Sequence, residues 1–337
     1  MKKIKEILPG LILALAIALL AKLIEKALPI HIIGGSVLAL FIGMILNNYI
    51  NTEKTLAKGI KFTSKRLLKF AIILLGASLN IGMVLEVGKL SIYVMAFTLL
   101  TCFGGGYFIG KALGLNWKMS NLISAGTGIC GGSAIASIAP VIDAEDTDVA
   151  YAMSATFLFD MLMILLFPIM GRALGLSDIA YGLWTGTAVN DTSSVVAAGF
   201  AFSEAAGDFA VMVKLTRTLS IIPVVIIFSI INNHIKKKEG GKKSVNKLSI
   251  TSIIPYFILG FLLMVGLNSG GVFSPSTSEM LKSISKFLMI AALAAIGLNT
   301  KFNEMKKSGI NPMIHGFVIS LLVVIVAISV EYFMGLV

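Results

Sequence analysis

Long apolar segments constrain this chain more than any other feature. Its apolar stretches do not alternate between polar and apolar positions, as the roughly ten-residue strands of a membrane barrel would. A helix needs about 20 apolar residues to cross a hydrocarbon core about 30 Å thick. We therefore predict an all-α polytopic membrane protein with about eleven transmembrane helices (ten or eleven). The predicted spans are 8–28, 30–50, 66–88, 90–113, 117–141, 147–172, 177–203, 208–233, 248–268, 276–300 and 310–336.

Composition supports this class and excludes others. Of the 337 residues, 57% are hydrophobic and 13% are charged, whereas soluble domains carry about 25% charged residues. The net charge of +11 arises in a few loops, which indicates membrane topology and contact with anionic lipid rather than nucleic acid. The apolar run after Lys2 and Lys3 is interpreted as a retained first helix rather than a signal peptide. Cys102 and Cys130 lie in apolar segments, which argues against a disulfide framework.

Loop charges predict the topology. The 51–66 and 234–247 loops are basic, whereas the 142–148 loop is acidic. Because basic loops face the cytoplasm, we expect a cytoplasmic N-terminus and an extracytoplasmic C-terminus. The basic linker 236–247 is the predicted boundary between two halves, 1–235 and 248–337, of a single transporter domain.

Two pairs of similar segments within the chain, here called echoes, suggest internal repeats. Residues 64–80 and 283–299 end in similar sequences and lie in spans of opposite predicted orientation, which is typical of an inverted repeat. The alternative is that two Ala- and Leu-rich helices agree by chance. The second echo relates Gly126, Thr127 and Ser133 to Gly186, Thr187 and Ser193. The predicted topology gives these two segments the same orientation, so either the echo is local convergence or one span is misplaced.

Both members of the second echo interrupt an apolar segment with small and polar residues. Such a segment suits a helix that unwinds at bilayer depth and offers its backbone to a solute. In the first interruption, glycines free the backbone and the next half-helix offers amides to an anion. The alternative is close helix packing through small residues. The candidate substrate-binding residues here are Thr127, Gly128, Cys130, Gly131, Gly132 and Ser133.

The second interruption carries an acid. A carboxylate in the middle of a span is costly unless it is paired or faces a wet cavity, so Asp191 is a candidate ion-coupling residue. The alternative is a hydrogen-bond network that only holds helices together. The candidate substrate-binding residues beside it are Asn190, Thr192, Ser193 and Ser194.

Three further charged residues lie within predicted spans. Asp160 is either a second ion-coupling residue that accepts a proton or a counter-ion to a basic residue. Lys214 and Arg217 share one helix face and are candidate substrate-binding residues for an anionic solute. Arg217 offers a planar fork that suits carboxylate, sulfate or sulfonate oxygens. Their alternatives are salt bridges to Asp191 or Asp160, or snorkelling to the surface.

Catalytic and metal-binding motifs are not found in the sequence. It contains no P-loop, no His-Glu-x-x-His and no Gly-x-Ser-x-Gly, and its three histidines do not cluster. We therefore expect no enzyme activity, no cofactor and no metal site.

The Gly-Ile-Cys-Gly-Gly-Ser-Ala-Ile string from Gly128, the Asn190-Asp191 pair and the Ala295–Asn299 stretch resemble the YeiH-like family of bacterial inner-membrane proteins, often labelled sulfate exporters. The resemblance covers essentially the whole chain. That family is in turn similar to sodium/proton antiporters and bile-acid/sodium symporters. The resemblance implies a location in the bacterial inner membrane and a fold with inverted repeats and two broken helices that cross near the midplane.

Together these features predict a secondary active transporter of a small anion, coupled to H⁺ or Na⁺. The alternatives are a cation/proton antiporter and a membrane scaffold or sensor subunit that transports nothing. The expected partners are the anionic solute, the coupling ion and membrane lipids, without nucleic acid. A homodimer is compatible with this prediction.

Overall fold

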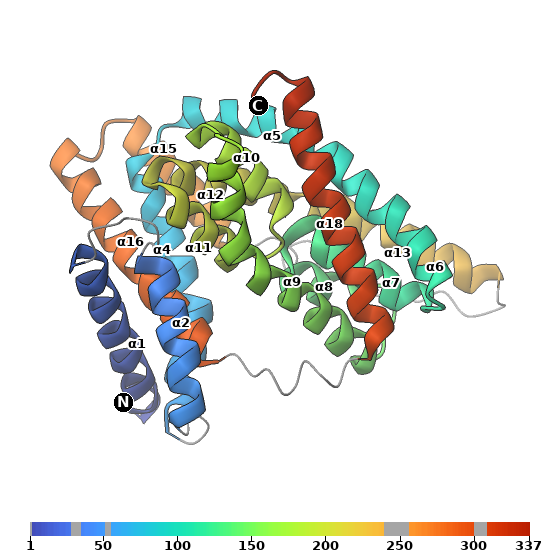
Figure 1. Ribbon diagram of the computed structural model, residues 1–337, viewed down its shortest axis with the longest axis horizontal. Helices are drawn as coiled ribbons and strands as arrows, with labels where there is room; N and C mark the ends of the chain where they lie inside the picture. The colour runs from blue at the N-terminus through green and yellow to red at the C-terminus, as the bar shows by residue number, and fades with distance from the viewer. Residues whose placement is uncertain (1, 28–34, 51–54, 239–255, 300–308) are drawn as a thin grey trace. The chain divides into compact units, whose positions relative to one another are not determined.

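The computed structural model describes residues 2–27, 35–50, 55–238, 256–299 and 309–337 (Figure 1). Over these residues the chain is helical and contains no β-strand. The predicted all-α class is therefore confirmed for the described part of the chain. Residues 239–247 of the predicted linker lie outside it.

The chain forms two compact units, and each draws on both sides of the 236–247 linker. Unit 1 comprises residues 1–86, 196–207 and 255–301, and unit 2 comprises the rest. The helices of unit 1 are α1 (Lys2–Ala27), α2 (Gly35–Tyr49), α3 (Ala57–Phe62), η1 (Thr63–Leu67), α4 (Leu68–Leu75), η2 (Gly76–Ser78), α15 (Tyr256–Ser269) and α16 (Pro275–Leu298).

Unit 2 contains the helices that carry both interruptions. They are η3 (Thr101–Gly105), α6 (Gly106–Ala112), α7 (Trp117–Ala125), η4 (Gly126–Cys130), α8 (Gly132–Ile138), α9 (Asp146–Ala173), α10 (Asp178–Ala188), α13 (Ile221–Lys238) and α18 (Ile310–Phe333). Three helices have residues in both units: α5 (Ile81–Leu100), α11 (Thr192–Phe202) and α12 (Glu204–Leu219).

Six helical segments of the described chain are long and apolar enough to cross a membrane. Three shorter apolar helices accompany them, at Leu38–Asn47, Thr192–Phe202 and Tyr256–Ser269. A multi-pass membrane protein is thus supported, whereas the finer prediction of about eleven spans is not confirmed.

One predicted span boundary was wrong. The expected division between spans 66–88 and 90–113 falls instead at Leu79, whose backbone is extended (φ −115°, ψ 154°). The Asn80 side chain then accepts a hydrogen bond from the Met83 amide at 2.8 Å and caps the start of α5. Helix then continues from Ile81 to Ala112 without a break, because Gly88 costs only about 1 kcal/mol in a helix interior and no proline lies in this stretch.

Unit 1 is packed through glycines. A Cβ atom added at Gly43 of α2 would lie 2.3 Å from the Ala294 carbonyl of α16, and one added at Gly297 would lie 2.1 Å from the Leu40 carbonyl. Side chains at these positions would push the two backbones apart, as in small-residue packing of membrane helices. The two segments of the first echo lie in this unit, and Ser285 of α16 donates to the Ala71 carbonyl of α4 at 2.6 Å. The inverted repeat itself stays a prediction.

In unit 2, α7 and α8 form a helical hairpin instead of one crossing segment. The two helices pack on each other. Just before α7, Asn116 donates to Asp148 at 3.0 Å, and Lys118 in the first turn of α7 donates to the Asp143 carbonyl at 2.7 Å. Both ends of the hairpin therefore lie at the same end of unit 2. The expected crossing span 117–141 was wrong, because Gly131 reverses the chain between the two helices (φ +62°).

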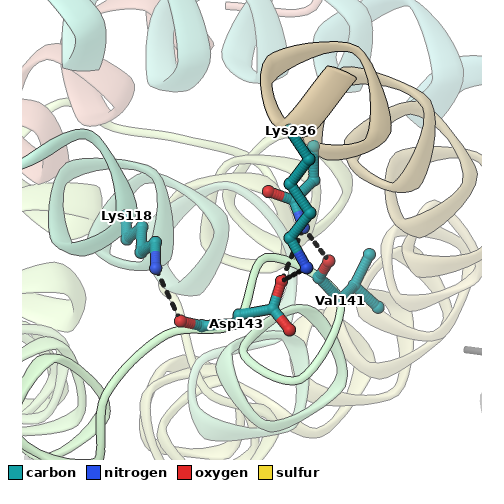
Figure 2. A network of polar contacts seen from close by, with 5 residues as sticks. Lys118, Val141, Asp143 and Lys236 are labelled. Carbon is teal, nitrogen blue, oxygen red and sulfur yellow. Dashed lines mark hydrogen bonds and ion pairs between the residues drawn. The ribbon is translucent and has the colours of Figure 1, made fainter. Parts of the chain in front are cut away.

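The turn after α8 is fixed to α13 by a polar cluster, seen in Figure 2. Lys236 pairs with the Asp143 carboxylate at 2.6 Å, and Asn232 donates to the same carboxylate at 2.8 Å and to the Val141 carbonyl at 2.9 Å. The loop charges led us to expect the 142–148 loop and the 234–247 linker on opposite sides. That expectation was wrong, because the acidic loop obtains its basic partners from α7 and α13 at its own end.

We expect Asp143→Asn to alter the response of stability to acid. The Lys236 ammonium and the Asn232 amide hold the pKa of the Asp143 carboxyl below its usual range, against the effect of burial. Its stabilisation is therefore present above the unfolded pKa of about 3.9 and is lost as the pH falls through the lower folded value. The side chains of Lys236 and Asp143 are 28% and 42% exposed, so solvent screening limits the contribution to about 1 kcal/mol or less.

Thermal unfolding of the purified protein at neutral and acidic pH measures this effect. Asp143→Asn should melt below wild type at neutral pH and should approach it in acid, whereas Glu279→Gln, a change of an exposed acid in α16, should run parallel to wild type. A constant difference between Asp143→Asn and wild type at every pH would contradict the assignment.

Candidate functional site

The first interruption begins where α7 widens into η4 and ends at Gly131. Close packing accounts for two of its glycines, since a Cβ atom at Gly126 would lie 2.8 Å from both Ile135 and Thr156, and one at Gly128 would lie 3.1 Å from Cys102. Gly131 has φ +62° and ψ −131°, a backbone conformation open to glycine alone. The segment from Gly126 to Gly131 is buried, so its unwound carbonyls need partners inside the protein.

The second interruption separates α10 from α11. Helix α10 ends at Ala188, Val189 is extended, and α11 begins at Thr192. Asp191 caps α11, because its Oδ2 accepts hydrogen bonds from the Ser193 amide at 2.9 Å and from the Ser193 hydroxyl. Asn190 is fully buried, whereas Asp191, Thr192 and Ser193 are partly exposed.

Two buried cations on α12 bind the unwound carbonyls. Lys214 donates to the carbonyls of Ile129 at 2.8 Å and Val189 at 3.0 Å. Arg217 donates from Nε to Gly128 at 2.6 Å and from one terminal nitrogen to Val189 at 3.2 Å. Its other terminal nitrogen binds the Thr127 carbonyl. Neither cation has exposed surface, so these carbonyls replace the water that both would otherwise need.

A buried carboxylate binds the opposite kind of backbone group. Asp160 of α9 accepts the amide of Asn190 at Oδ1 and the amide of Asp191 at Oδ2, both at 2.9 Å. These amides precede α11, where a negative charge is favoured by the helix dipole. Thus the cations satisfy the carbonyls before each break, and Asp160 satisfies the amides after the second.

The two interruptions meet within unit 2. Lys214 binds one carbonyl from each of them, and a Cβ atom at Gly131 would lie 3.2 Å from Oδ1 of Asp191. Ser320 of α18 adds a further link, because its hydroxyl lies 3.5 Å from the Thr127 hydroxyl and accepts a hydrogen bond from Nδ2 of the Asn190 side chain at 3.4 Å. Two cations, two carboxylates and the unwound backbone therefore form one polar junction inside apolar helices.

Sequence comparison identifies relatives along the whole chain. A family model described as conserved hypothetical protein 698 matches residues 9–316. A UPF0324 membrane protein of Clostridium tetani is 53% identical over 340 residues, which cover 98% of this chain and 99% of the relative. The chain belongs to the UPF0324 family. UPF0324 membrane proteins of Streptococcus agalactiae and Streptococcus mutans are 41% and 36% identical, with 98% of both chains covered in each case. The resemblance to the YeiH-like family is thereby confirmed.

This UPF0324 chain brings together most of the residues that its sequence singled out. Asp160, Lys214 and Arg217 converge on both interruptions from two other helices. Their partners differ from those considered, because the two cations bind backbone carbonyls and Asp160 binds backbone amides. Cys130 and Ser194 are buried at 2% exposure each, whereas Ser133 is exposed, so these three do not share one environment.

Ser320 is the residue of the junction that sequence reasoning missed. A single serine in an apolar helix gives a weak signal, because serine often bonds its own backbone there. In the described part of this UPF0324 chain, no group of three or more His, Cys, Asp or Glu side chains could hold a metal ion.

Proposed function

We propose that this UPF0324 protein is a secondary active transporter of the bacterial inner membrane. Its substrate is a small anion such as sulfate, a sulfonate or an organic anion, and transport is coupled to H⁺ or Na⁺. The supporting observation is the buried junction, where Lys214 and Arg217 bind carbonyls from both interruptions. Irregular backbone at membrane depth is tolerated where it is buried in protein or lines a cavity, and transporters build substrate sites from such helices.

Asp191 and Asp160 have different roles in this proposal. Both oxygens of Asp160 accept backbone amides, so Asp160 holds the second interruption in place and is a positioning residue. The Asp191 carboxylate accepts hydrogen bonds only from Ser193 in its own turn among the contacts described, and Asp191 is partly exposed beside Gly131. It can therefore change its protonation state without releasing a second helix.

The substrate lies beside Asp191, where the hydroxyls of Ser133, Thr192 and Ser193 are at least partly exposed. An anion next to an ionised carboxylate would be repelled, so binding requires Asp191 to take up a proton or a sodium ion. The positive charges of Lys214 and Arg217, buried on the other side of the unwound backbone, attract the anion electrostatically. This links substrate binding to ion binding in a single site.

A cation/proton antiporter is the second candidate. The observation that favours it is that Lys214 and Arg217 already bind backbone carbonyls, whereas Asp191 is accessible. In that case the Asp191 carboxylate holds the transported cation, and the two basic residues only balance charge.

Radiolabelled sulfate flux into proteoliposomes, with imposed proton or sodium gradients, tests the proposal. We expect gradient-driven uptake by wild type and uptake below about a tenth of that rate by Asp191→Asn, since a tenfold loss corresponds to only about 1.4 kcal/mol. Asp191→Asn should keep the wild-type melting temperature within a few degrees, whereas Asp160→Asn should lower it, because an amide nitrogen would face a backbone N–H.

Glu279→Gln, which changes an exposed acid of α16, is the control and should transport normally. Sodium/proton exchange without flux of sulfate, a sulfonate or an organic anion would favour the antiporter. Equal flux by wild type and Asp191→Asn would remove the coupling role of Asp191.

A further inference from the structure

Glu331 is a buried carboxyl group that the junction does not use. It lies in the last turn of α18 with no exposed surface, and neither of its oxygens has a hydrogen-bond partner among the residues that the structure describes. The other buried carboxylates of the described chain differ in this respect. Asp148 bonds Asn116, Asp160 bonds two amides, and Asp208 makes a contact of its own.

The register of α18 against its neighbours locates Glu331. A Cβ atom at Gly316 would lie 3.0 Å from Ala155 of α9. Further along, Trp184 of α10 stacks on Phe167 of α9 and donates to the Val324 carbonyl at 2.9 Å. Helices α9 and α18 therefore run parallel, and Glu331 lies about two turns, or about 10 Å, beyond Val324. That position is beside the turn 174–177 that joins α9 to α10.

Titratable groups near this turn form no hydrogen bond with the Glu331 oxygens among the described residues. Arg172 and Asp178 flank the turn and Tyr181 lies one turn into α10, and each of the three has contacts of its own. The opposite end of α18 from Glu331 lies beside the end of α6, because Asn311 in the first turn of α18 donates to the Leu113 carbonyl at 3.1 Å. We call this the α6 end. On α18 itself, Tyr332 directly follows Glu331, but its side chain is exposed and makes a ring contact with Phe333. The remaining titratable groups with described side chains, on α18 and on the helices packed against it, lie towards the α6 end or at the junction: Tyr107, Lys111, Lys118, Cys102, Cys130, Asp148, Tyr151, Asp160 and His315.

Burial without a partner dictates the chemical form of this group. An ionised carboxylate in an apolar interior is strongly disfavoured, and the group becomes neutral by taking up a proton. Ionisable residues inside membrane segments commonly belong to proton pathways or binding sites. We propose that Glu331 is a proton-binding site that keeps the last turn of α18 in the bundle only while it carries the proton.

The step is a simple protonation. One carboxylate oxygen forms an O–H bond with a proton from water, and the same bond breaks when the turn moves into water and the proton returns to solvent. The site is separate from the Asp191 junction, and it holds whether or not the chain transports an anion.

Infrared spectroscopy of the purified full-length chain tests this directly. We expect the C=O stretch of a protonated carboxyl group at neutral pH and its loss in Glu331→Gln, which mimics the protonated side chain. Raising the pH by about three units should lower the melting temperature of wild type by about 2 °C or more and should leave Glu331→Gln nearly unchanged.

Glu279→Gln is the matched control, because Glu279 is an exposed acid of α16. It should keep both the infrared band and the pH dependence of wild type. The proposal would be overturned if wild type showed no protonated-carboxyl band that disappears in Glu331→Gln. An equal pH dependence of the melting temperature in the two proteins would also overturn it. If Glu331→Gln does not fold, Glu331→Leu takes its place, because an apolar side chain suits a buried position without a polar partner. A wild-type spectrum with no protonated-carboxyl band at neutral pH would overturn the proposal by itself.

Discussion

Arg217→Ala is expected to leave little folded protein in the membrane. The guanidinium binds the carbonyls of Thr127, Gly128 and Val189 at the junction, and alanine would leave these bonds unmade. Each hydrogen bond to a charged group contributes about 1.5–3 kcal/mol. The loss of three is thus a large fraction of the roughly 5–15 kcal/mol that stabilises a typical folded protein.

The yield of monodisperse protein after detergent extraction, and its melting temperature, measure this effect. Arg217→Lys should lie between wild type and alanine, because an ammonium retains the charge but lacks the planar fork. Thr216→Ala is the matched control, since the neighbouring Thr216 hydroxyl bonds only within its own helix at 3.1 Å. Near-normal stability of Arg217→Ala would mean that the carbonyls find other partners, and the role given to Arg217 would fail.

Gly131→Ala is expected to distort the tip of the α7–α8 hairpin and to abolish transport. The φ of +62° is strained for any residue with a side chain, and such conformations cost about 1–3 kcal/mol. The new Cβ atom would also lie 3.2 Å from Oδ1 and 3.3 Å from Cβ of Asp191. Asp191 would therefore move from the position that couples ion and substrate in our proposal.

The next residue supplies a sharp comparison. A Cβ atom at Gly132 would meet only the Met153 methyl group, at 3.9 Å, and Gly132 begins the regular helix α8. Gly132→Ala should therefore keep the melting temperature of wild type, whereas Gly131→Ala should melt several degrees lower and show sulfate uptake near background. Similar results for the two variants would show that the conformation of Gly131 is unimportant.

Much of the site could be predicted from residue types alone. Charged residues in apolar segments are costly and rare, so Asp160, Asp191, Lys214 and Arg217 stand out in the amino-acid sequence. The glycines of the first interruption indicated non-helical backbone, and Gly131 has that conformation. The all-helical class followed from the apolar segments.

The partners of these residues could not be predicted. Whether a buried lysine binds a carboxylate or a carbonyl depends on which chain segments meet, and side-chain identities do not record the carbonyls of Ile129 and Val189. Glu331 was missed for a related reason. It follows a long apolar run near a helix end, where an acid usually reaches water, and only the packing of α18 reveals its burial.

The hairpin was missed because apolar length does not encode direction. Residues 117–141 are as long as a crossing helix, yet α7 and α8 return to the end from which they started. Because 117–141 does not cross, the shared orientation that the predicted topology gave to the two interruptions no longer applies.

The ion pair between Asp143 and Lys236 also constrains how many times the chain crosses the membrane between these two residues. Two residues in direct contact at one end of unit 2 lie on one side of a bilayer, so the chain between them crosses an even number of times. Helix α9 is long enough to cross once. The stretch 174–235 must then supply an odd number of crossings, whereas the sequence predicted two there, 177–203 and 208–233. The predicted count of two crossings in this stretch is therefore wrong, and the side assigned to every later loop depends on the corrected count.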